Sequence, residues 1–491
     1  MTQATPSYTT LKLLIDGEWL DQQGRDTVPV LNPATEHVLA HLPVASVDDV
    51  DRAAEAAARS FPLWRDTSAY ERAKILMKTG ELLRERVEHI ARLMTLEQGK
   101  PLNQAIQEVT HLPDMLIWHA EEGRRIYGRS IPARDLGHRQ ISAREPIGAV
   151  AAFTTWNYPA MIPMKKVCAI LASGCTCVLK GAEETPASTM EIVKAFVDAG
   201  LPKGVLNLVY GEPNRTSSQL IASPFIQGVS FTGSTAIGRL LAEQAGRHLK
   251  RTVMELGGHA PVIVMDDVKD IAGLARTSVL RKFRNSAQGC VNPSRFFVHS
   301  KVYDEFLETF VKETQALVIG DGFSDGVNMG PLAHERRLDA MRQCVDDALE
   351  KGATLLHGGR RMDRPGYFWT PTVFTDVPSH ALMMNEEPFG PVVPINAFDD
   401  IEAVLHEANR LPVGLAAYAF TNSTYWANQL SRRLEAGMVA INSFAFGAAN
   451  ASSTPEVPFG GIKASGFGAE CGSEGIEGYL NIKFISEYEQ A

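Results

Sequence analysis

Residues 147–155 read IGAVAAFTT, a short apolar run that ends in small and polar residues. Three further runs of this kind follow along the chain: CTCVLKGA at 175–182, GVLNLVYG at 204–211 and GVSFTGS at 228–234. Stretches of helical character lie between or after them, at about 160–173, 186–199, 214–222 and 235–246. Buried strands that alternate with helices predict a parallel sheet with crossover connections, and ligands bind such sheets at the carboxyl ends of the strands.

The segments on either side of this pattern predict other kinds of secondary structure. Residues 12–45 predict short strands and turns, and residues 46–125 predict helices, with Ser46 as the N-cap of the first. A second α/β region is expected from 258 to 450. It includes a strand followed by a helix in SRFFVHSKVYDEFLETFVKETQAL at 294–317. The last stretch, GIEGYLNIKFISEY at 475–488, predicts a turn or short helix and then a strand.

Bulk composition excludes several classes of function. The 491 residues carry a net charge of −9, which gives no electrostatic reason to bind nucleic acid or an anionic membrane. No apolar run is long enough to span a membrane, and the N-terminus lacks the pattern of a secretory signal, so we expect a cytoplasmic protein. The six cysteines are too sparse for a disulfide framework, and no Cys or His spacing supports a metal site.

One cysteine, Cys290, lies among small and polar residues in FRNSAQGCVNPSRF at 283–296. Its local composition alone leaves four readings open: buried filler, metal ligand, half of a disulfide, or nucleophile. A choice between them needs partners from elsewhere in the chain.

Candidate partners lie in other segments of the chain. Asn157, in TTWNYP, has an amide that can donate to an oxyanion, and Glu255, in VMELGGHAP, can act as a general base. Gly233 and Ser234 stand where a strand turns into a helix, whose free N–H groups can hold a phosphate. Each also has an ordinary structural reading as a turn or surface residue, and His259 is typical of a structural hydrogen bond.

The order of these motifs along nearly the whole chain resembles that of the aldehyde dehydrogenase superfamily. The motifs are TTWNYP, LKGAEETP, FTGST, ELGGHAP, the Cys290 stretch, EEPFGPV and PFGGIKASGFG. Within the superfamily the chain is most similar to succinate-semialdehyde dehydrogenases, on FRN before the cysteine, PFGGIKASGFG and GIEGYLNIK. This implies a Rossmann-like cofactor domain, an α/β catalytic domain and a small β oligomerisation arm.

The resemblance implies a role for each matching residue. Cys290 is the nucleophile that forms a thiohemiacetal, Asn157 and the Cys290 N–H form the oxyanion hole, and Glu255 activates the water that hydrolyses the thioester. The implied cofactor-binding residues are Thr155, Trp156, Lys180, Glu183, Gly233, Ser234, Glu387 and Phe389. Because the Glu183 carboxylate would repel a 2′-phosphate, we expect NAD rather than NADP.

Two positions depart from the family pattern. The family usually has proline where this chain has Thr155, and glycine where it has Ala287. A methyl group at 287 is expected to fit if the backbone there does not need a positive φ.

The implied substrate is a small aldehyde with an anionic tail, such as succinate semialdehyde. Arg284 matches one of two arginines that bind the distal carboxylate in such enzymes, and Lys165 falls on the other. Tyr158 and Ser453 are further candidates for substrate contact. A structural ion pair at Arg284, a sulfonated aldehyde, and an aromatic or other aliphatic aldehyde stay open as alternatives, as do a CoA-acylating and a non-catalytic relative.

The resemblance also implies boundaries and assembly. We expect 1–123 and 146–257 to bind NAD and 258–450 to carry catalysis. Residues 124–145 and 472–491 would form the oligomerisation arm, and 451–471 an active-site loop that returns to the cofactor domain. The expected assembly is a homodimer or homotetramer.

Overall fold

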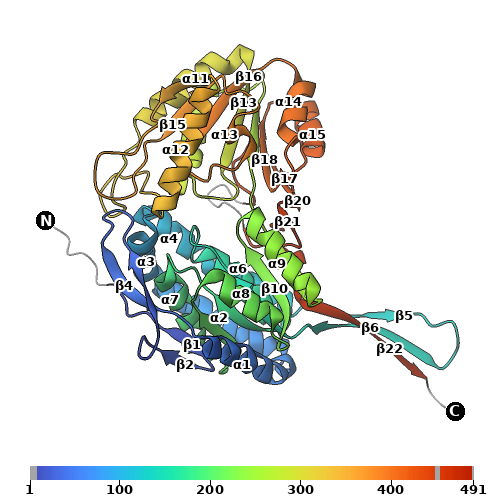
Figure 1. Cartoon of the computed structure of the whole chain (residues 1–491). Helices are drawn as coiled ribbons and strands as arrows, with labels where there is room; N and C mark the ends of the chain where they lie inside the picture. Colours follow the sequence, from blue (N-terminus) through green and yellow to red (C-terminus); the bar gives the residue numbers. More distant parts are fainter. Residues whose placement is uncertain (1–7, 448–453, 489–491) are drawn as a thin grey trace.

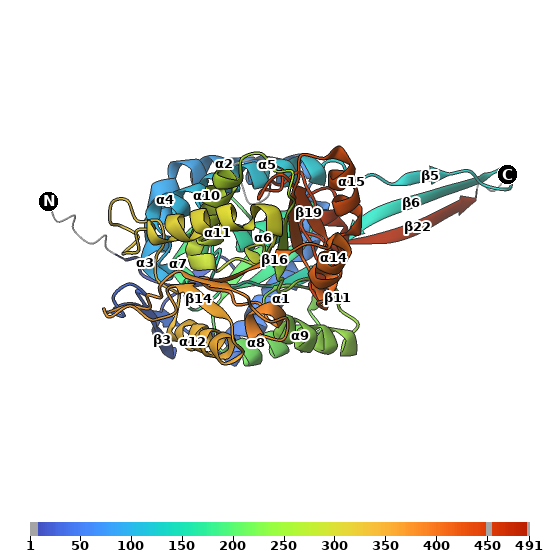
Figure 2. The ribbon, with the colours of Figure 1, turned by 90° about the horizontal axis from the view of Figure 1, so that it is seen from above.

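The computed structural model describes residues 8–447 and 454–488 (Figure 1). Two α/β bodies, each built on one large sheet, lie one above the other in Figure 1, and a narrow β arm projects sideways from them. The view from above in Figure 2 shows the same arm extending well clear of the helices.

The first sheet has eight strands in the order β2-β1-β9-β8-β7-β10-β11-β21. Strands β7 to β11 are parallel to one another. On one side β1 pairs antiparallel with β9, and on the other β21 pairs antiparallel with β11. The strands are β1 (Leu13–Ile15), β2 (Glu18–Leu20), β7 (Ala149–Phe153), β8 (Thr176–Lys180), β9 (Leu206–Val209), β10 (Ile226–Thr232), β11 (Arg251–Glu255) and β21 (Gly466–Phe467). The crossover helices are α6 (Met161–Ser173), α7 (Pro186–Asp198), α8 (Pro213–Ala222) and α9 (Thr235–Arg247).

An N-terminal helical layer packs on this sheet after the hairpin of β3 (Thr27–Leu31) and β4 (Val38–Pro43). Its helices are α1 (Val47–Asp66), α2 (Ala69–Glu85), α3 (Val87–Gln98), α4 (Leu102–Thr110) and α5 (Leu112–Gly123). Ser46 caps α1 and forms a capping box with Asp49, as its position predicted. The buried indole of Trp64 donates to the Leu171 carbonyl at 3.1 Å, which ties α1 to α6.

The second sheet has seven strands in the order β14-β15-β16-β13-β12-β18-β19. They are β12 (Ala260–Val264), β13 (Pro293–His299), β14 (Thr354–His357), β15 (Thr372–Thr375), β16 (Val392–Phe398), β18 (Ala416–Phe420) and β19 (Met438–Ile441). The helices of this body are α10 (Ile271–Lys282), η1 (Arg284–Ala287), α11 (Ser300–Gln315), α12 (Glu335–Glu350), α13 (Leu382–Asn385), α14 (Ile401–Asn409) and α15 (Thr424–Arg433). Phe296, Phe306 and Phe310 pack ring against ring between this sheet and α11, where buried aromatic area stabilises the body.

Short strands connect the two bodies and form the arm. β17 (Val413–Gly414) pairs with β20 (Ile462–Lys463), which directly precedes β21 of the first sheet. The arm is a three-stranded antiparallel sheet in the order β22-β6-β5. Its elements are β5 (Arg129–Ile131), β6 (His138–Pro146), η2 (Glu474–Tyr479) and β22 (Leu480–Tyr488).

The expected architecture of two α/β bodies and a small β arm is confirmed, including the alternation of strands and helices between 147 and 247. Strand β11 was not predicted as a strand, because its sequence RTVME carries three polar residues and only its second half is buried. Gly233 is needed for a reason other than the expected turn. A Cβ there would lie 2.2 Å from the Phe231 ring, so the glycine makes room for a neighbouring side chain.

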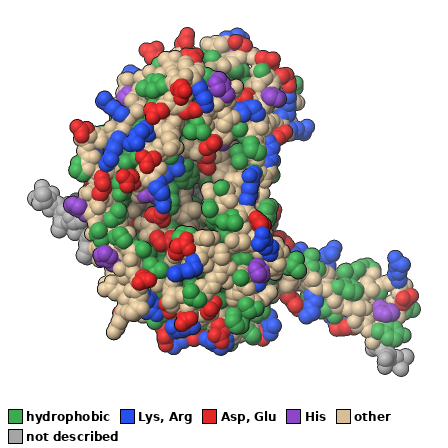
Figure 3. All heavy atoms as spheres, in the orientation of Figure 1, with side chains coloured by type: hydrophobic (Ala, Val, Ile, Leu, Met, Phe, Trp, Pro, Cys, Tyr) green, Lys and Arg blue, Asp and Glu red, His purple; other side chains and the backbone are tan. Residues whose placement is uncertain are grey.

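Among the described residues, no helix is both long enough and apolar enough to cross a membrane. The face shown in Figure 3 mixes acidic and basic side chains, and hydrophobic side chains are visible along the arm.

Candidate active site

The candidate nucleophile, oxyanion donor and base come from three different segments. Asn157 follows strand β7, Glu255 ends strand β11, and Cys290 follows η1 in the second body. Gly258, three residues after Glu255, lies against Cys290, since a Cβ on it would be 2.9 Å from the Cys290 carbonyl oxygen. Asn157 Nδ2 donates to the carbonyl of Gln288, two residues before Cys290. The carboxyl ends of the first sheet thus face the turn that carries the cysteine, as expected for a ligand site in a parallel sheet.

Cys290 is half-buried, and burial raises the pKa of its thiol to about 12. The Lys165 ammonium is the strongest opposing influence, while Glu387 and Glu255 add to the rise in pKa. A thiol in such a place reacts only when a nearby cation or base favours the thiolate.

The turn before Cys290 has three successive non-glycine residues in the left-handed region: Asn285 at φ 51°, Ser286 at φ 52° and Ala287 at φ 59°. The backbone at Ala287 therefore does need a positive φ, and the condition under which its methyl group would fit without cost is not met. A left-handed non-glycine residue costs about 1–2 kcal/mol. Buried hydrogen bonds hold the turn, such as Gln98 Nε2 to Asn285 Oδ1 at 2.8 Å and Ser286 Oγ to the Gly330 carbonyl at 2.8 Å.

Asn157 is buried and its side-chain amide is held at both ends. Its Nδ2 donates to the Gln288 carbonyl at 3.1 Å, and its Oδ1 accepts from the Thr155 hydroxyl at 2.7 Å. Its backbone carbonyl accepts from Asn285 Nδ2 at 2.9 Å and from Lys100 Nζ at 3.2 Å.

Glu255 is only 2% exposed, and neither of its carboxyl oxygens has a hydrogen-bond partner among the described residues. Burial raises its pKa well above the ordinary value, and the Glu470 carboxylate raises it further. Gly460 packs close to the carboxyl group, because a Cβ there would lie 3.3 Å from Oε1. A buried carboxylate without hydrogen-bond donors is a candidate to accept a proton from water.

Two consecutive lysines of α6 lie near this centre. Lys165 is 3% exposed, and its Nζ lies 3.3 Å from the centroid of the Phe459 ring. Lys166 is fully buried, forms an ion pair with Glu470 at 2.7 Å and donates to Ser230 Oγ at 3.1 Å. Both lysines oppose the rise in the pKa of Glu255.

The predicted ribose-binding pair stands at the end of β8. Lys180 Nζ donates to both carboxylate oxygens of Glu183, at 2.6 and 2.8 Å, and the Gly211 N–H donates to the same carboxylate at 3.0 Å. Glu183, Gly211, Pro213 and His334 line a cavity of about 560 Å³, a size typical of small-molecule sites. Ser234 caps α9 by accepting from the Ile237 N–H at 3.4 Å.

Glu387 and Phe389 approach from the second body. Burial raises the pKa of Glu387 to about 8, opposed by Arg337 and by a hydrogen bond from the Gly258 N–H. Phe389, at φ 47°, meets Trp156 edge to face with ring centroids 5.6 Å apart. Trp156 also contacts His334 at 5.0 Å, so it links the loop after β7 to the second body.

Arg284 is half-buried and forms a hydrogen bond with the Tyr158 hydroxyl. Burial raises the pKa of Tyr158 to about 12, and Arg284 opposes this rise. Lys100 Nζ lies 4.2 Å from the centroid of the Tyr158 ring. Ser453 lies outside the described residues. Phe444 and Phe446 are buried and pack against the Tyr418 ring, with centroids 5.2 and 5.6 Å from it.

Sequence reasoning missed the buried groups that support the loop after β7. Glu108 pairs with Lys100 and accepts from the N–H groups of Ala160 and Met161 near the start of α6, at 3.1 and 3.0 Å. Arg295, five residues after Cys290, donates to the backbone carbonyls of His259 and Ala408 and is structural. No local pattern marks these residues, because their partners lie far away in the sequence.

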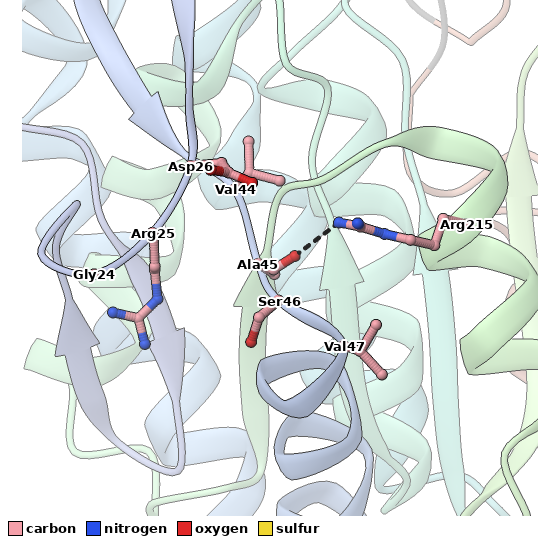
Figure 4. A pocket seen from close by; sticks show the side chains of 8 residues that line it. All are labelled: Gly24, Arg25, Asp26, Val44, Ala45, Ser46, Val47 and Arg215. Atoms are coloured by element: carbon pink, nitrogen blue, oxygen red, sulfur yellow. Dashed lines mark hydrogen bonds between the residues drawn. The ribbon is translucent and has the colours of Figure 1, made fainter.

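A second pocket, of about 400 Å³, lies near the start of α1 and contains none of the candidate site residues (Figure 4). Its two arginines are already engaged: Arg25 pairs with Asp49 at 2.9 Å, and Arg215 donates to the Ala45 carbonyl at 3.1 Å. Among the described residues, no group of three or more His, Cys, Asp or Glu side chains is arranged to hold a metal ion.

Comparison with known proteins identifies the family. Residues 19–485 match the aldehyde dehydrogenase family, and the chain belongs to it as an NAD(P)-dependent aldehyde dehydrogenase. It is 44% identical to the 4-(hydroxymethyl)benzenesulfonate dehydrogenase of Comamonas testosteroni, over 98% of this chain and 99% of that one. It is 42% identical to the NADP-dependent succinate-semialdehyde dehydrogenase of Escherichia coli, over 96% of each chain. The crystal structure of succinate-semialdehyde dehydrogenase from Burkholderia pseudomallei is 37% identical, with a TM-score of 0.95 over 100% of both chains.

Proposed function

We propose that the chain oxidises an aldehyde with an anionic tail, such as succinate semialdehyde, to the carboxylic acid with NAD. The observation that carries this proposal is the grouping around Cys290. Asn157 Nδ2 donates to the carbonyl of Gln288, two residues before the cysteine, and Glu255 and Lys165 are close enough to act on the pKa of Cys290. Lys165 also acts on the pKa of Glu255. Arg284 adds a second cation, half-buried beside Tyr158.

Cys290 begins the reaction as its thiolate, which attacks the aldehyde carbonyl and forms a thiohemiacetal. Lys165 favours the thiolate, because a nearby cation opposes the burial that raises the thiol pKa. Negative charge develops on the former carbonyl oxygen, where Asn157 Nδ2 and the Cys290 N–H donate hydrogen bonds to it. Loss of a hydride from the thiohemiacetal carbon restores the carbonyl and leaves a thioester on Cys290, and a bound NAD would supply the hydride acceptor.

Glu255 completes the reaction. It removes a proton from water, which then hydrolyses the thioester on Cys290 and releases a free acid. Glu255 acts as a base in its ionised form, which Lys165 and Lys166 favour because both lower its pKa. Burial makes that carboxylate a stronger proton acceptor than an exposed one. The same carboxyl group argues against transfer of the acyl group to CoA as the main route.

The residues present fit a bound nucleotide. Lys180 and Glu183 would hold the adenosine ribose, Ser234 and the start of α9 would receive the pyrophosphate, and Glu387 would hold the nicotinamide ribose. Thr155, Trp156 and Phe389 would border the nicotinamide ring, and Gly233 would give the chain room to approach. The Glu183 carboxylate is held in place by Lys180 and the Gly211 N–H. A 2′-phosphate beside it would meet a group of like charge, which favours NAD.

An aromatic aldehyde with a sulfonate tail is the second candidate. The similarity to a dehydrogenase for a benzenesulfonate supports it, and so does the aromatic layer of Tyr418, Phe444 and Phe446. Lys165 and Arg284 would serve either tail, because both cations bind carboxylates and sulfonates through their oxygens.

The test is the rate of NADH formation with matched pairs of aldehydes, each with NAD and NADP. Succinate semialdehyde is paired with butanal, and 4-sulfonated benzaldehyde with benzaldehyde, so that only the anionic group differs. In the pair that contains the better substrate, we expect kcat/KM to be at least about tenfold higher for the charged aldehyde than for the uncharged one. We expect R284M to reduce this ratio while it spares the uncharged aldehyde. A preference for butanal or benzaldehyde would refute the anion-binding role.

The proposal extends to domains and assembly. Residues 1–123 and 146–257 would bind the cofactor and 258–450 would carry catalysis, while 451–471 would form the substrate loop. The arm, 124–145 with 472–491, would join subunits into a homodimer or homotetramer. Its strand β22 exposes Ile482 (66%) and Phe484 (59%), which supports contact with another subunit. Light scattering in solution distinguishes the two assemblies.

A further inference from the structure

The orientation of the Asn157 side-chain amide is fixed by the chemistry of its two neighbours. The Gln288 carbonyl, 3.1 Å away, can only accept a hydrogen bond, so the atom facing it is Nδ2. The other end of the amide is therefore Oδ1, which only accepts. The Thr155 hydroxyl, 2.7 Å from it, must be the donor.

This arrangement leaves one amide hydrogen for a ligand. Nδ2 carries two hydrogens, and the contact with Gln288 uses one of them. No second acceptor for Nδ2 is recorded in the part of the chain that the structure describes. Gln288 lies two residues before Cys290, so the amide is anchored next to the nucleophile.

The loop backbone does not depend on Thr155 for its position. The Asn157 carbonyl is held by Asn285 and Lys100, and the buried Glu108 carboxylate holds the N–H groups that follow. The Thr155 hydroxyl thus acts on the amide itself. The terminal torsion of an asparagine side chain is broad and roughly twofold. Without the Thr155 hydroxyl, only the hydrogen bond to Gln288 would restrain this torsion in Asn157.

We propose that Thr155 is a positioning residue of the oxyanion hole. Its hydroxyl holds Oδ1 of Asn157, so that the second Nδ2 hydrogen stays directed at the aldehyde oxygen attacked by Cys290. The inference rests on the proposed function and adds to it a residue at which this chain departs from the usual proline, whose side chain has no hydrogen-bond donor.

The experiment compares T155V, which replaces the hydroxyl by a methyl group of similar size, with T155S, which keeps a hydroxyl. Turnover is measured by NADH formation, and Cys290 accessibility by the rate of alkylation with iodoacetamide. Alkylation forms no oxyanion, so it reports the thiol and the loop without the hole. Binding of NAD and thermal melting are measured for each variant as controls on the fold.

We expect T155V to lower kcat by about 3- to 10-fold, the loss of one hydrogen bond that supports an oxyanion donor. Alkylation by iodoacetamide is expected to stay within about twofold of the unaltered protein, and T155S to recover at least about half of kcat. Unchanged turnover in T155V would overturn the inference. So would a T155S variant as slow as T155V, or alkylation that slows in parallel with turnover.

Failure of the proposed function shows separately, in the unaltered protein. If that protein oxidises none of the aldehydes with either cofactor, the oxyanion role of Asn157 falls, and that of Thr155 falls with it. If it does oxidise them and T155V matches it, only the role of Thr155 falls.

Discussion

Glu183 and Glu255 lie near the carboxyl ends of two strands in the same sheet, yet their surroundings are opposite. Glu183 receives two hydrogen bonds from Lys180 and one from the Gly211 N–H, at 2.6, 2.8 and 3.0 Å. Glu255 is 2% exposed, has no hydrogen-bond partner among the described residues, and lies near a second carboxylate, Glu470. Glu183 is fixed by hydrogen-bond donors, and Glu255 has none among the described residues.

The difference separates a carboxylate suited to binding from one suited to proton transfer. Donors favour the charged form and fix its geometry, which suits recognition of ribose hydroxyls. Burial without donors favours the protonated form and raises the pKa, which suits a group that must take up and release a proton. Both residues are glutamates near strand ends of one sheet, so the surrounding groups determine which one is suited to binding and which to proton transfer.

The largest expected effect tests the proton-transfer side. E255Q is expected to lower steady-state turnover by about 10²–10⁴-fold, because the amide cannot accept the proton of water. Attack by Cys290 does not need this base, so rapid mixing is expected to show a burst of NADH and an accumulated thioester, visible by mass spectrometry. The control is E243Q, which removes an exposed carboxylate of α9. Loss of the burst in E255Q would assign Glu255 to an earlier step.

The next effect tests the binding side. E183Q is expected to raise the KM for NAD by about tenfold, since a charged acceptor for ribose is replaced by a neutral amide, and to change kcat little. The same variant is expected to narrow the gap between NAD and NADP, because a repulsive charge near the 2′-phosphate is removed. Steady-state kinetics with both cofactors measures this. A fall in kcat with unchanged KM would contradict the division of roles between the two carboxylates.

The smallest expected effect concerns stability. E255M removes a buried carboxyl group without partners and fills its place with apolar atoms, so the free energy of unfolding is expected to rise by about 1–3 kcal/mol. E183M is expected to lower it, because Lys180 loses its partner. Denaturant titration measures both variants. A destabilised E255M would show that Glu255 has a structural role.

The sign of the pH dependence follows from the raised pKa of Glu255. At pH values above the ordinary 4.5, the unfolded chain has lost this proton while the folded protein keeps it until its own higher pKa. The folded state binds more protons in this window, so the contribution of Glu255 to stability falls as pH rises through it. E255M is expected to lose this part of the pH dependence, and E183M to keep it.

Much of the molecule was predictable from local pattern. Ser46 and the apolar runs after residue 147 specify their helix cap and strands through short-range rules, and each took the predicted form. Strand β11 was missed because its polar first half hides the pattern. The candidate site was inferred from the order of motifs, because no single motif identified Cys290 as a nucleophile. The family that this order indicated is confirmed by the family match.

The sequence by itself determined the alternation of strands and helices, the family, and which residue types stand at the strand ends. Only the tertiary structure decided that Glu255 has no partner, that Ala287 lies at φ 59°, and that Thr155 orients Asn157. Strands and caps follow from neighbours in the chain, so sequence pattern records them. A pKa or the orientation of an amide depends on burial and on donors that the fold brings from distant segments, and a linear pattern does not contain those distances.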